Sequence, residues 1–308
     1  MNRWFPNGGV SLLACAVMAT FAPATASAQL WSWTKDQMKE YTKAWTGERF
    51  LDGRPKIPDS MLQRAREMSM EEITIPAAGG RGGGNIYSQY AGDWMVLQPG
   101  KKMVGRAFTV QFMPARADLD AVSTAKAKEK GVQALSNQYA IDMLQPGDVL
   151  VVDLFGKKEG GTIVGDNLFY YVMKATKNGG LVVDGSIRDL EGIAEMPMPA
   201  YVRSVHPSAI SGATLSGINI PIRIGNVTVM PGDLVVGDRE GISFIPPQAV
   251  SDILDRADTI HVHDEWTRKK FDEGKYKSSE IYGSPKDPAL KKEYEEYLKK
   301  RLEEIRKK

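Results

Sequence analysis

The hydrophobic and polar positions divide the chain into two helical ends and a mixed middle. Residues 29–70 carry apolar positions at helical spacing behind two capping motifs, at Thr34–Gln37 and Ser60–Gln63. We interpret this region as helical and peripheral. From residue 94 to residue 245, short continuous apolar runs alternate with helical patterns, and such runs are typical of strands buried on both faces of a sheet. The order of these elements predicts an α/β domain.

Individual elements follow from this pattern and from the turn residues between them. Strands are expected at residues 95–97, 103–112, 149–154 and 181–184, and helices at residues 117–144, 165–177 and 248–271. After Gly283, Asp287 can cap a charged helix that has Pro288 at its first position. An apolar stripe on this helix predicts packing against its own domain or a neighbouring subunit. The alternative, a helix on a membrane surface, is disfavoured by its interleaved glutamates.

The N-terminus has the parts of a secretory signal peptide. Arg3 is the one charge before an apolar stretch at residues 10–19, and small residues follow up to Ala28. We predict cleavage after Ala28 and a periplasmic or secreted protein. A membrane anchor and a lipoprotein cleavage site at Cys15 are the alternatives. The mature chain would contain no cysteine, hence no disulfide, and no transmembrane segment.

Composition and motifs argue against several classes of function. The net charge of +2 argues against a nucleic-acid-coating protein, so no nucleic-acid partner is expected. The three histidines, His206, His261 and His263, form no zinc-binding pattern. The sequence contains neither a Gly-x-Ser-x-Gly elbow nor the glycine fingerprint of dinucleotide-binding folds.

One constellation carries candidate chemistry. Gly165–Leu168 opens a predicted helix, whose N-terminus offers unpaired N–H groups and a positive dipole end that bind carboxylate or phosphate. Arg188 and Asp189 follow the next buried strand. Arginine can hold a carboxylate with two parallel hydrogen bonds, and aspartate is a hard oxygen ligand suited to Mg²⁺.

Five segments of the chain resemble the RraA-like family, which includes 4-hydroxy-4-methyl-2-oxoglutarate and 4-carboxy-4-hydroxy-2-oxoadipate aldolases. They occur in the family's order, at residues 97–110, 146–153, 165–168, 182–189 and 231–241. The most specific of them is Val183-Asp184-Gly185-Ser186-Ile187-Arg188-Asp189. The resemblance covers residues 94–250.

The resemblance implies a fold, an assembly and an activity. The fold is α/β, a compact layered α/β/β domain of the swivelling β/β/α kind, here with helical N- and C-terminal extensions. The assembly is a homo-oligomer, a trimer or hexamer. The activity is that of a class II, metal-dependent pyruvate aldolase, a lyase that cleaves 4-hydroxy-2-oxo acids and often decarboxylates oxaloacetate. The cofactor is a divalent cation, Mg²⁺ or Mn²⁺, and the substrate is a small 2-oxo acid.

The resemblance also assigns site residues. The residues that would bind substrate are those of the turn and the arginine: Gly165, Asp166, Asn167, Leu168 and Arg188. Asp189 would hold the metal, and Arg188 and Asp166 would act in catalysis, Asp166 near the metal's water. A glutamate from the C-terminal helix of a neighbouring subunit completes some sites of the family. Glu265 is the best match, with Asp264 and Glu240 as alternatives.

The chain departs from the family pattern in three respects. The spacing from Gly165 to Arg188 is about one residue longer, extensions flank the common domain, and export is unusual for such an enzyme. The predicted organisation is a signal peptide at residues 1–28, an N-terminal extension at 29–90, an RraA-like catalytic domain at 91–275 and a charged helical tail at 276–308. A non-catalytic regulatory or binding protein of the same fold is the alternative function.

Overall fold

The computed structural model describes most of the chain after the predicted signal peptide. The described residues are 31–77, 89–129, 131–132 and 137–307. The predicted signal peptide, residues 1–28, lies outside the described residues, as does the glycine-rich segment at 79–84. Within the described ranges, no helix combines the length and the apolar character that crossing a bilayer requires.

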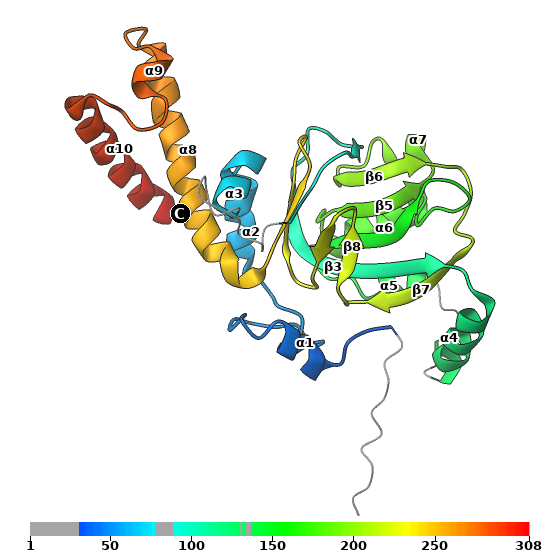
Figure 1. Ribbon diagram of the computed structural model, residues 1–308. Helices are drawn as coiled ribbons and strands as arrows, with labels where there is room; N and C mark the ends of the chain where they lie inside the picture. Colours follow the sequence, from blue (N-terminus) through cyan, green and yellow to red (C-terminus); the bar gives the residue numbers. More distant parts are fainter. Residues whose placement is uncertain (1–30, 78–88, 130, 133–136, 308) are drawn as a thin grey trace, which may run out of the picture.

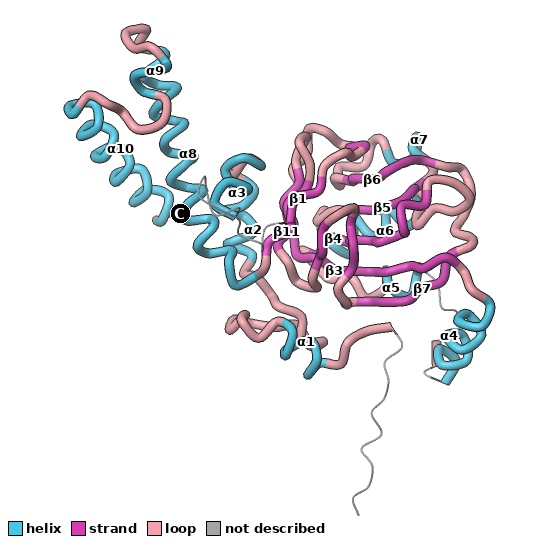
Figure 2. The backbone as a smooth tube through the Cα atoms, in the orientation of Figure 1, coloured by secondary structure: helices cyan, strands magenta, loops and turns pink. Residues whose placement is uncertain are grey.

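A mixed sheet forms the centre of the molecule (Figures 1 and 2). Its order is β1-β11-β10-β3-β4-β5-β6-β2, with β7 paired to β3 off this path. The bounds are β1 Gln89–Ala91, β2 Met95–Val96, β3 Met103–Pro114, β4 Asp148–Lys157, β5 Leu181–Ile187, β6 Ala200–Val205, β7 Ala213–Ile218, β10 Leu234–Gly237 and β11 Ile242–Ile245. The four central strands, β3 to β6, run parallel, and the other pairs are antiparallel. A separate hairpin joins β8 Ile222–Ile224 and β9 Val227–Val229.

Helices and the hairpin cover the sheet on different faces. The helices are α1 Lys35–Tyr41, α2 Asp59–Arg66, α3 Met70–Ala77, α4 Ala117–Glu129, α5 Asn137–Ile141, α6 Asp166–Thr176, α7 Leu190–Ile193, α8 Val250–Asp272, α9 Ser278–Ile281 and α10 Pro288–Arg306, with a 3₁₀ turn at Pro247–Ala249. Side chains alternate along β4: Leu150 and Val152 pack in the cluster with α5 and α6, whereas Val149 and Val151 pack under the β8–β9 hairpin. The predicted layered α/β fold is confirmed.

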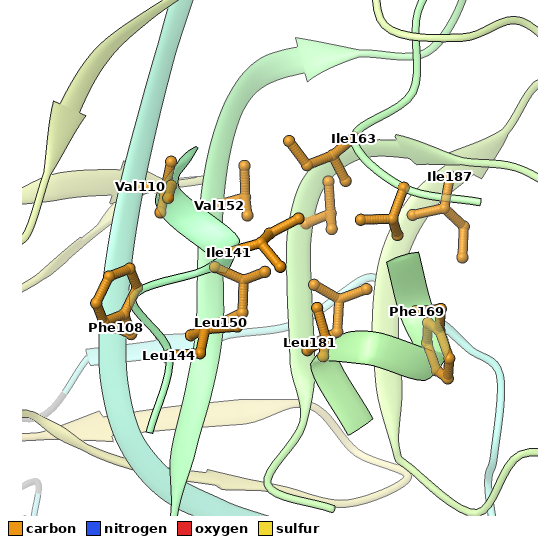
Figure 3. Close-up of a cluster of buried hydrophobic side chains, with 14 of the residues drawn as sticks. Phe108, Val110, Ile141, Leu144, Leu150, Val152, Ile163, Phe169, Leu181 and Ile187 are labelled. Atoms are coloured by element: carbon orange, nitrogen blue, oxygen red, sulfur yellow. The ribbon is translucent and has the colours of Figure 1, made fainter. Parts of the chain in front are cut away.

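The largest core cluster lies between the parallel strands and α6 (Figure 3). Phe169 of α6 is fully buried there, together with Leu181 and Ile187 of β5. Figure 3 shows Phe108 of β3 and Ile141 of α5 in the same cluster. This packing fixes α6 along the sheet, so the first turn of α6 is held near the carboxyl ends of the parallel strands.

The N-terminal extension is not peripheral, which corrects the prediction from the sequence. Arg54 is fully buried, and its guanidinium forms two hydrogen bonds with the buried carboxylate of Asp148, at 2.6 and 3.1 Å. The same guanidinium stacks on Phe50 at 4.4 Å and lies 5.2 Å from the ring of Phe108. The cause is long-range: Asp148 begins a core strand, and Arg54 of the extension supplies its cation.

The two predicted capping motifs have different outcomes. Thr34 caps α1 in a full capping box with Gln37, as the spacing predicted. The second prediction was wrong, because α2 begins at Asp59 after Pro58 and has no side-chain cap. Ser60 therefore lies inside the first turn of α2, where the preceding proline sets the helix start.

The C-terminal helix α10 packs on α8, as the first reading of its apolar stripe predicted. The ring of Tyr294 lies 5.4 Å from that of His263 and 5.2 Å from that of Trp266. Lys270 of α8 is 2.7 Å from the carboxylate of Glu293. Figure 1 shows the two helices extending together away from the sheet.

Asp233, at the turn before β10, should make the stability of the protein pH-dependent. Burial raises the pKa of Asp233 to about 7, although the N–H of Met230 donates to its carboxyl oxygen at 2.8 Å and opposes the shift. The native carboxyl keeps its proton up to that pH, whereas the unfolded chain releases it near the ordinary pKa of 3.8. Folding takes up a proton between these values, so the free energy of unfolding should fall as the pH rises from 4 to 7.

An Asp233→Asn variant isolates this effect, because asparagine can still accept the Met230 hydrogen bond. Each unit of pKa corresponds to about 1.4 kcal/mol, so the wild type should lose up to a few kcal/mol more than the variant between pH 4 and pH 8. Urea unfolding at both pH values measures the difference. Equal losses in the two proteins would contradict the prediction.

Candidate active site

The carboxyl ends of β4, β5 and β6 meet at one edge of the sheet. Arg188 directly follows β5. Its backbone N–H donates to Val164 O at 3.1 Å, so the chain entering α6 lies beside the chain leaving β5. The parallel pairing thus brings together the two segments that the sequence singled out, residues 165–168 and 188–189.

Gly165 is the point at which these two segments touch. A Cβ at this position would lie 2.1 Å from Asp189 Oδ2 and 2.9 Å from Arg188 Nε. The backbone of Gly165 is extended, with φ −108° and ψ −168°, so it is the close contact and not the backbone angle that requires glycine. Gly165 is also the N-cap of α6 and makes no side-chain cap. Asp166 accepts the N–H of Asn167, so the other N–H groups of the first turn and the positive end of the helix dipole are left to solvent or a ligand.

Asp189 holds an unusual backbone conformation beside this contact. Its φ of 63° and ψ of 47° lie in the left-handed region, which is uncommon for a residue with a β-carbon. Its side chain is 43% exposed, and Oδ2 lies 3.2 Å from Arg188 Nε. Backbone strain of this kind is concentrated at functional sites. The carboxylate is therefore held in place and open to a ligand.

Two partners orient the guanidinium of Arg188. Nε faces Asp189, and Nη1 donates to Thr162 Oγ1 at 3.1 Å. Thr162 is fully buried, whereas the Arg188 side chain is 26% exposed. The exposed part of the planar group can form further hydrogen bonds with a carboxylate. Thr162 was not predicted from the sequence, because a single threonine in a loop carries no recognisable signal.

The rest of the predicted turn forms the start of α6. One carboxylate oxygen of Asp166 accepts the N–H of Asn167 at 2.7 Å. The Asp166 side chain lies against Gly192 of α7, where a Cβ would be 2.7 Å from its Oδ2. Asn167 is exposed, and Leu168 packs against the main core cluster. Asp166 and Asn167 are thus available to a ligand, and Leu168 anchors the turn.

Glu265 lies elsewhere in the same chain. It projects from α8 and forms an ion pair with Arg301 of α10 at 3.0 Å. Hydrogen bonds from Arg301 and Tyr297 hold the pKa of Glu265 below its ordinary value. Asp264 and Glu240 line the same cleft beside α8. Figure 1 shows α8 beside α2 and α3, across the molecule from α6 and α7, so none of the three acids joins the Arg188 site within one chain.

The carboxylates at this edge suit a hard cation with few protein ligands. Among the described residues, no group of three or more His, Cys, Asp or Glu side chains is arranged to hold a metal ion. Asp189 nevertheless offers an exposed carboxylate at a cradle that a Cβ on Gly165 would fill. Mg²⁺ commonly keeps several water ligands and binds proteins through one or two carboxylates. The residues present therefore fit an ion of that class.

The model of the RraA-like family, described as Aldolase/RraA, matches residues 84–243, just over half of the chain. The chain belongs to the RraA-like family. The matched region contains the Gly165 turn, Arg188 and Asp189, so the resemblance seen in the sequence is confirmed. Glu265 and the α8–α10 pair lie beyond it.

Several curated relatives of this chain are named as putative aldolases. A "Putative 4-hydroxy-4-methyl-2-oxoglutarate aldolase" of Halalkalibacterium halodurans is 32% identical over 120 residues, which are 39% of this chain and 56% of that protein. A relative of the same name from Ectopseudomonas mendocina is 36% identical over 113 residues, 36% of this chain and 67% of that protein. The chain thus spans just over half the length of the first of these relatives.

Solved structures share the fold. Streptomyces coelicolor RraAS2, described as an unusual member of the RNase ES inhibitor RraA protein family, matches with a TM-score of 0.57 and 27% identity. The match covers 70% of this chain and all of that one. An uncharacterized protein of Pseudomonas syringae matches with a TM-score of 0.56 at 22% identity, over 72% of this chain and 96% of that one. The second likeness shows the fold alone.

Proposed function

We propose that this protein is a divalent-metal-dependent lyase that cleaves 4-hydroxy-2-oxo acids to pyruvate and also decarboxylates oxaloacetate. The observation that carries the proposal is the contact at Gly165, which places a helix N-terminus, a guanidinium and an exposed carboxylate within one small region. These three groups suit a 2-oxo acid, which presents a carboxylate and a keto oxygen, and on which negative charge develops at the keto oxygen during cleavage. The aldolase names of the relatives support the same reaction class.

The chain's own residues would bind and orient the substrate. The first-turn N–H groups of α6 and the guanidinium of Arg188 would hold the substrate carboxylate. When the C3–C4 bond breaks, negative charge develops on the 2-oxo oxygen, and a fixed donor such as Arg188 stabilises it without reorganisation. Asp166 would take the proton of the 4-hydroxyl through an intervening water and return it to the pyruvate carbon.

Asp189 would hold the metal, Mg²⁺ or Mn²⁺. A divalent cation at this carboxylate supplies Lewis-acid stabilisation of the charge that forms on the keto group. Arg188, whose Nε lies 3.2 Å from Asp189 Oδ2, keeps that carboxylate correctly directed. A carboxylate ligand suits hard ions of this class.

Glu265 could reach this site only from another copy of the chain. We therefore propose a homo-oligomer, a trimer or hexamer, in which α8 of a neighbouring subunit brings Glu265 toward Arg188. We also propose that the protein is exported, with cleavage after Ala28. Both proposals rest on the sequence patterns and the family resemblance.

A non-catalytic regulator is the second candidate. Its support is the likeness to RraAS2, which belongs to a family of RNase ES inhibitors. The two functions differ in what they require of the residues around Gly165. A lyase needs them for turnover, whereas a regulator needs only a binding surface there.

The proposed function is tested by following pyruvate release from a panel of 4-hydroxy-2-oxo acids and from oxaloacetate. We expect turnover with Mg²⁺ or Mn²⁺, loss of turnover in excess EDTA and recovery when the metal is added back. The reason is that a single aspartate with water ligands releases its ion readily to a chelator. Full turnover in EDTA, with metal content measured as zero, would contradict metal dependence. Absence of turnover on the whole panel would favour the regulator.

Gly165→Ala should lower turnover by about 10–100-fold, because its methyl group displaces the Asp189 carboxylate and the Arg188 guanidinium from their positions. Gly100→Ala is the matched control, since a Cβ at Gly100 meets nothing within 4 Å. Pyruvate release and the melting temperature should be measured for both variants. Unchanged turnover in a folded Gly165→Ala protein would show that the contact does not support chemistry.

A further inference from the structure

His206 lies beside Arg188 at the same edge of the sheet. The strands β5 and β6 pair in parallel with Ile187 opposite Val205. The pairing continues one residue further, because the N–H of His206 donates to Ile187 O at 3.0 Å. His206 and Arg188 are therefore the first residues beyond two neighbouring strands. In the sequence, His206 is one of three histidines that form no zinc-binding pattern, and no other signal distinguishes it.

The ring of His206 is held by Ser208. The backbone N–H of Ser208 donates to Nδ1 at 3.2 Å, and the Ser208 hydroxyl lies 2.9 Å from the same nitrogen. A backbone N–H can only donate, so Nδ1 carries the lone pair and the neutral ring has its proton on Nε2. Nδ1 therefore acts as the acceptor that shapes the turn at Ser208.

This turn is connected to Arg188 through Thr162. The hydroxyl of Thr162 donates its one proton to Ser208 O at 2.7 Å. The oxygen of that hydroxyl then accepts from Arg188 Nη1 at 3.1 Å. Thr162 is fully buried, so its hydroxyl has no competing solvent. The donor and the acceptor of these two hydrogen bonds are thus determined: the Arg188 guanidinium donates to Thr162, and Thr162 donates to the Ser208 carbonyl.

We propose that His206 is a positioning residue for Arg188: its Nδ1 holds the Ser208 turn, whose carbonyl orients the Thr162 hydroxyl toward the guanidinium. The consequence for turnover rests on the proposed lyase function, whereas the positioning itself does not. Removing the Nδ1 acceptor frees the Ser208 N–H, the turn relaxes, and the carbonyl no longer fixes Thr162. Arg188 then keeps its charge and loses its orientation.

Two substitutions at His206 separate positioning from other roles. In His206→Asn the side-chain oxygen can take the place of Nδ1, so the Ser208 N–H keeps an acceptor. In His206→Gln the polar atoms lie nearer to the place of Nε2, and the acceptor at the Nδ1 position is lost. His206→Gln should lower kcat/KM by about 10–100-fold at an unchanged melting temperature, and His206→Asn should stay near wild type. His261→Gln is the matched control, because His261 pairs with Glu72 in the helical part of the chain.

A second readout does not need activity. In protein labelled with ¹⁵N-arginine, the Nε–H signal of Arg188 is identified by its loss in Arg188→Lys. We expect this signal to move in His206→Gln and to stay in place in His206→Asn and in His261→Gln. An Arg188 signal that stays in place in His206→Gln would overturn the proposal, as would equal loss of turnover in the two His206 variants. If the Arg188 signal moved in His206→Gln but the wild type had no lyase turnover, the positioning role would be upheld and the proposed function would be rejected.

Discussion

Arg188→Lys and Asp189→Asn should each lower pyruvate release by about 10²–10³-fold while the fold remains intact. Lysine keeps the positive charge but loses the planar pair of donors, one of which Thr162 holds at 3.1 Å. Asparagine keeps the shape of Asp189 but offers a neutral oxygen, so the affinity for the metal should also fall. Both side chains are partly exposed, so neither change leaves a buried charge without a partner. Turnover, metal affinity and melting temperature should be measured together.

The surface pair Arg116 and Asp118 provides the matched control. Its side chains are 76% and 67% exposed, and Arg116 Nε lies 2.8 Å from Asp118 Oδ1. Arg116→Lys and Asp118→Asn repeat the same chemical changes in an exposed pair at the start of α4 and should leave turnover unchanged. If the Arg188 and Asp189 variants kept wild-type turnover as folded proteins, the proposed site would be wrong. A fall in melting temperature that accounts for the lost activity would indicate a structural pair.

Arg54→Met should destabilise the folded protein by about 3–5 kcal/mol, the usual effect of removing one partner of a buried ion pair. Methionine fills much of the space between Phe50 and Phe108, so the main loss is the cation that compensates Asp148. Neither Arg54 nor Asp148 is accessible to solvent, and water cannot replace the lost partner. Urea unfolding followed by circular dichroism measures the change.

Two further proteins test this explanation. Arg116→Met makes the same substitution in an exposed ion pair and should change stability little. Adding Asp148→Asn to Arg54→Met removes the uncompensated charge and should restore part of the lost stability, since asparagine can still accept the N–H of Gln145. If Arg54→Met unfolded no more easily than Arg116→Met, the extension would not be an integral part of the domain.

The sequence by itself determined the features that depend on neighbouring residues. Continuous apolar runs predicted β4 and β5, because a strand buried on both faces needs apolar residues at every position. The capping box at Thr34 predicted the start of α1, since its two hydrogen bonds join residues three apart. The motif from Val183 to Asp189 indicated the family and the chemistry of the site, and these residues form one continuous stretch of chain.

The tertiary structure alone decided which distant residues meet. The contact of Gly165 with Asp189 arises because β4 and β5 run parallel. No local pattern shows that a Cβ at residue 165 would lie 2.1 Å from a carboxylate 24 positions further along the chain. Arg54 pairs with Asp148 across 94 residues, so the extension that reads as peripheral in the sequence belongs to the core. Thr162 and His206 join Arg188 for the same reason, because the loops after parallel strands meet at one edge. Local periodicity determines which elements form, whereas long-range burial decides which side chains share a site.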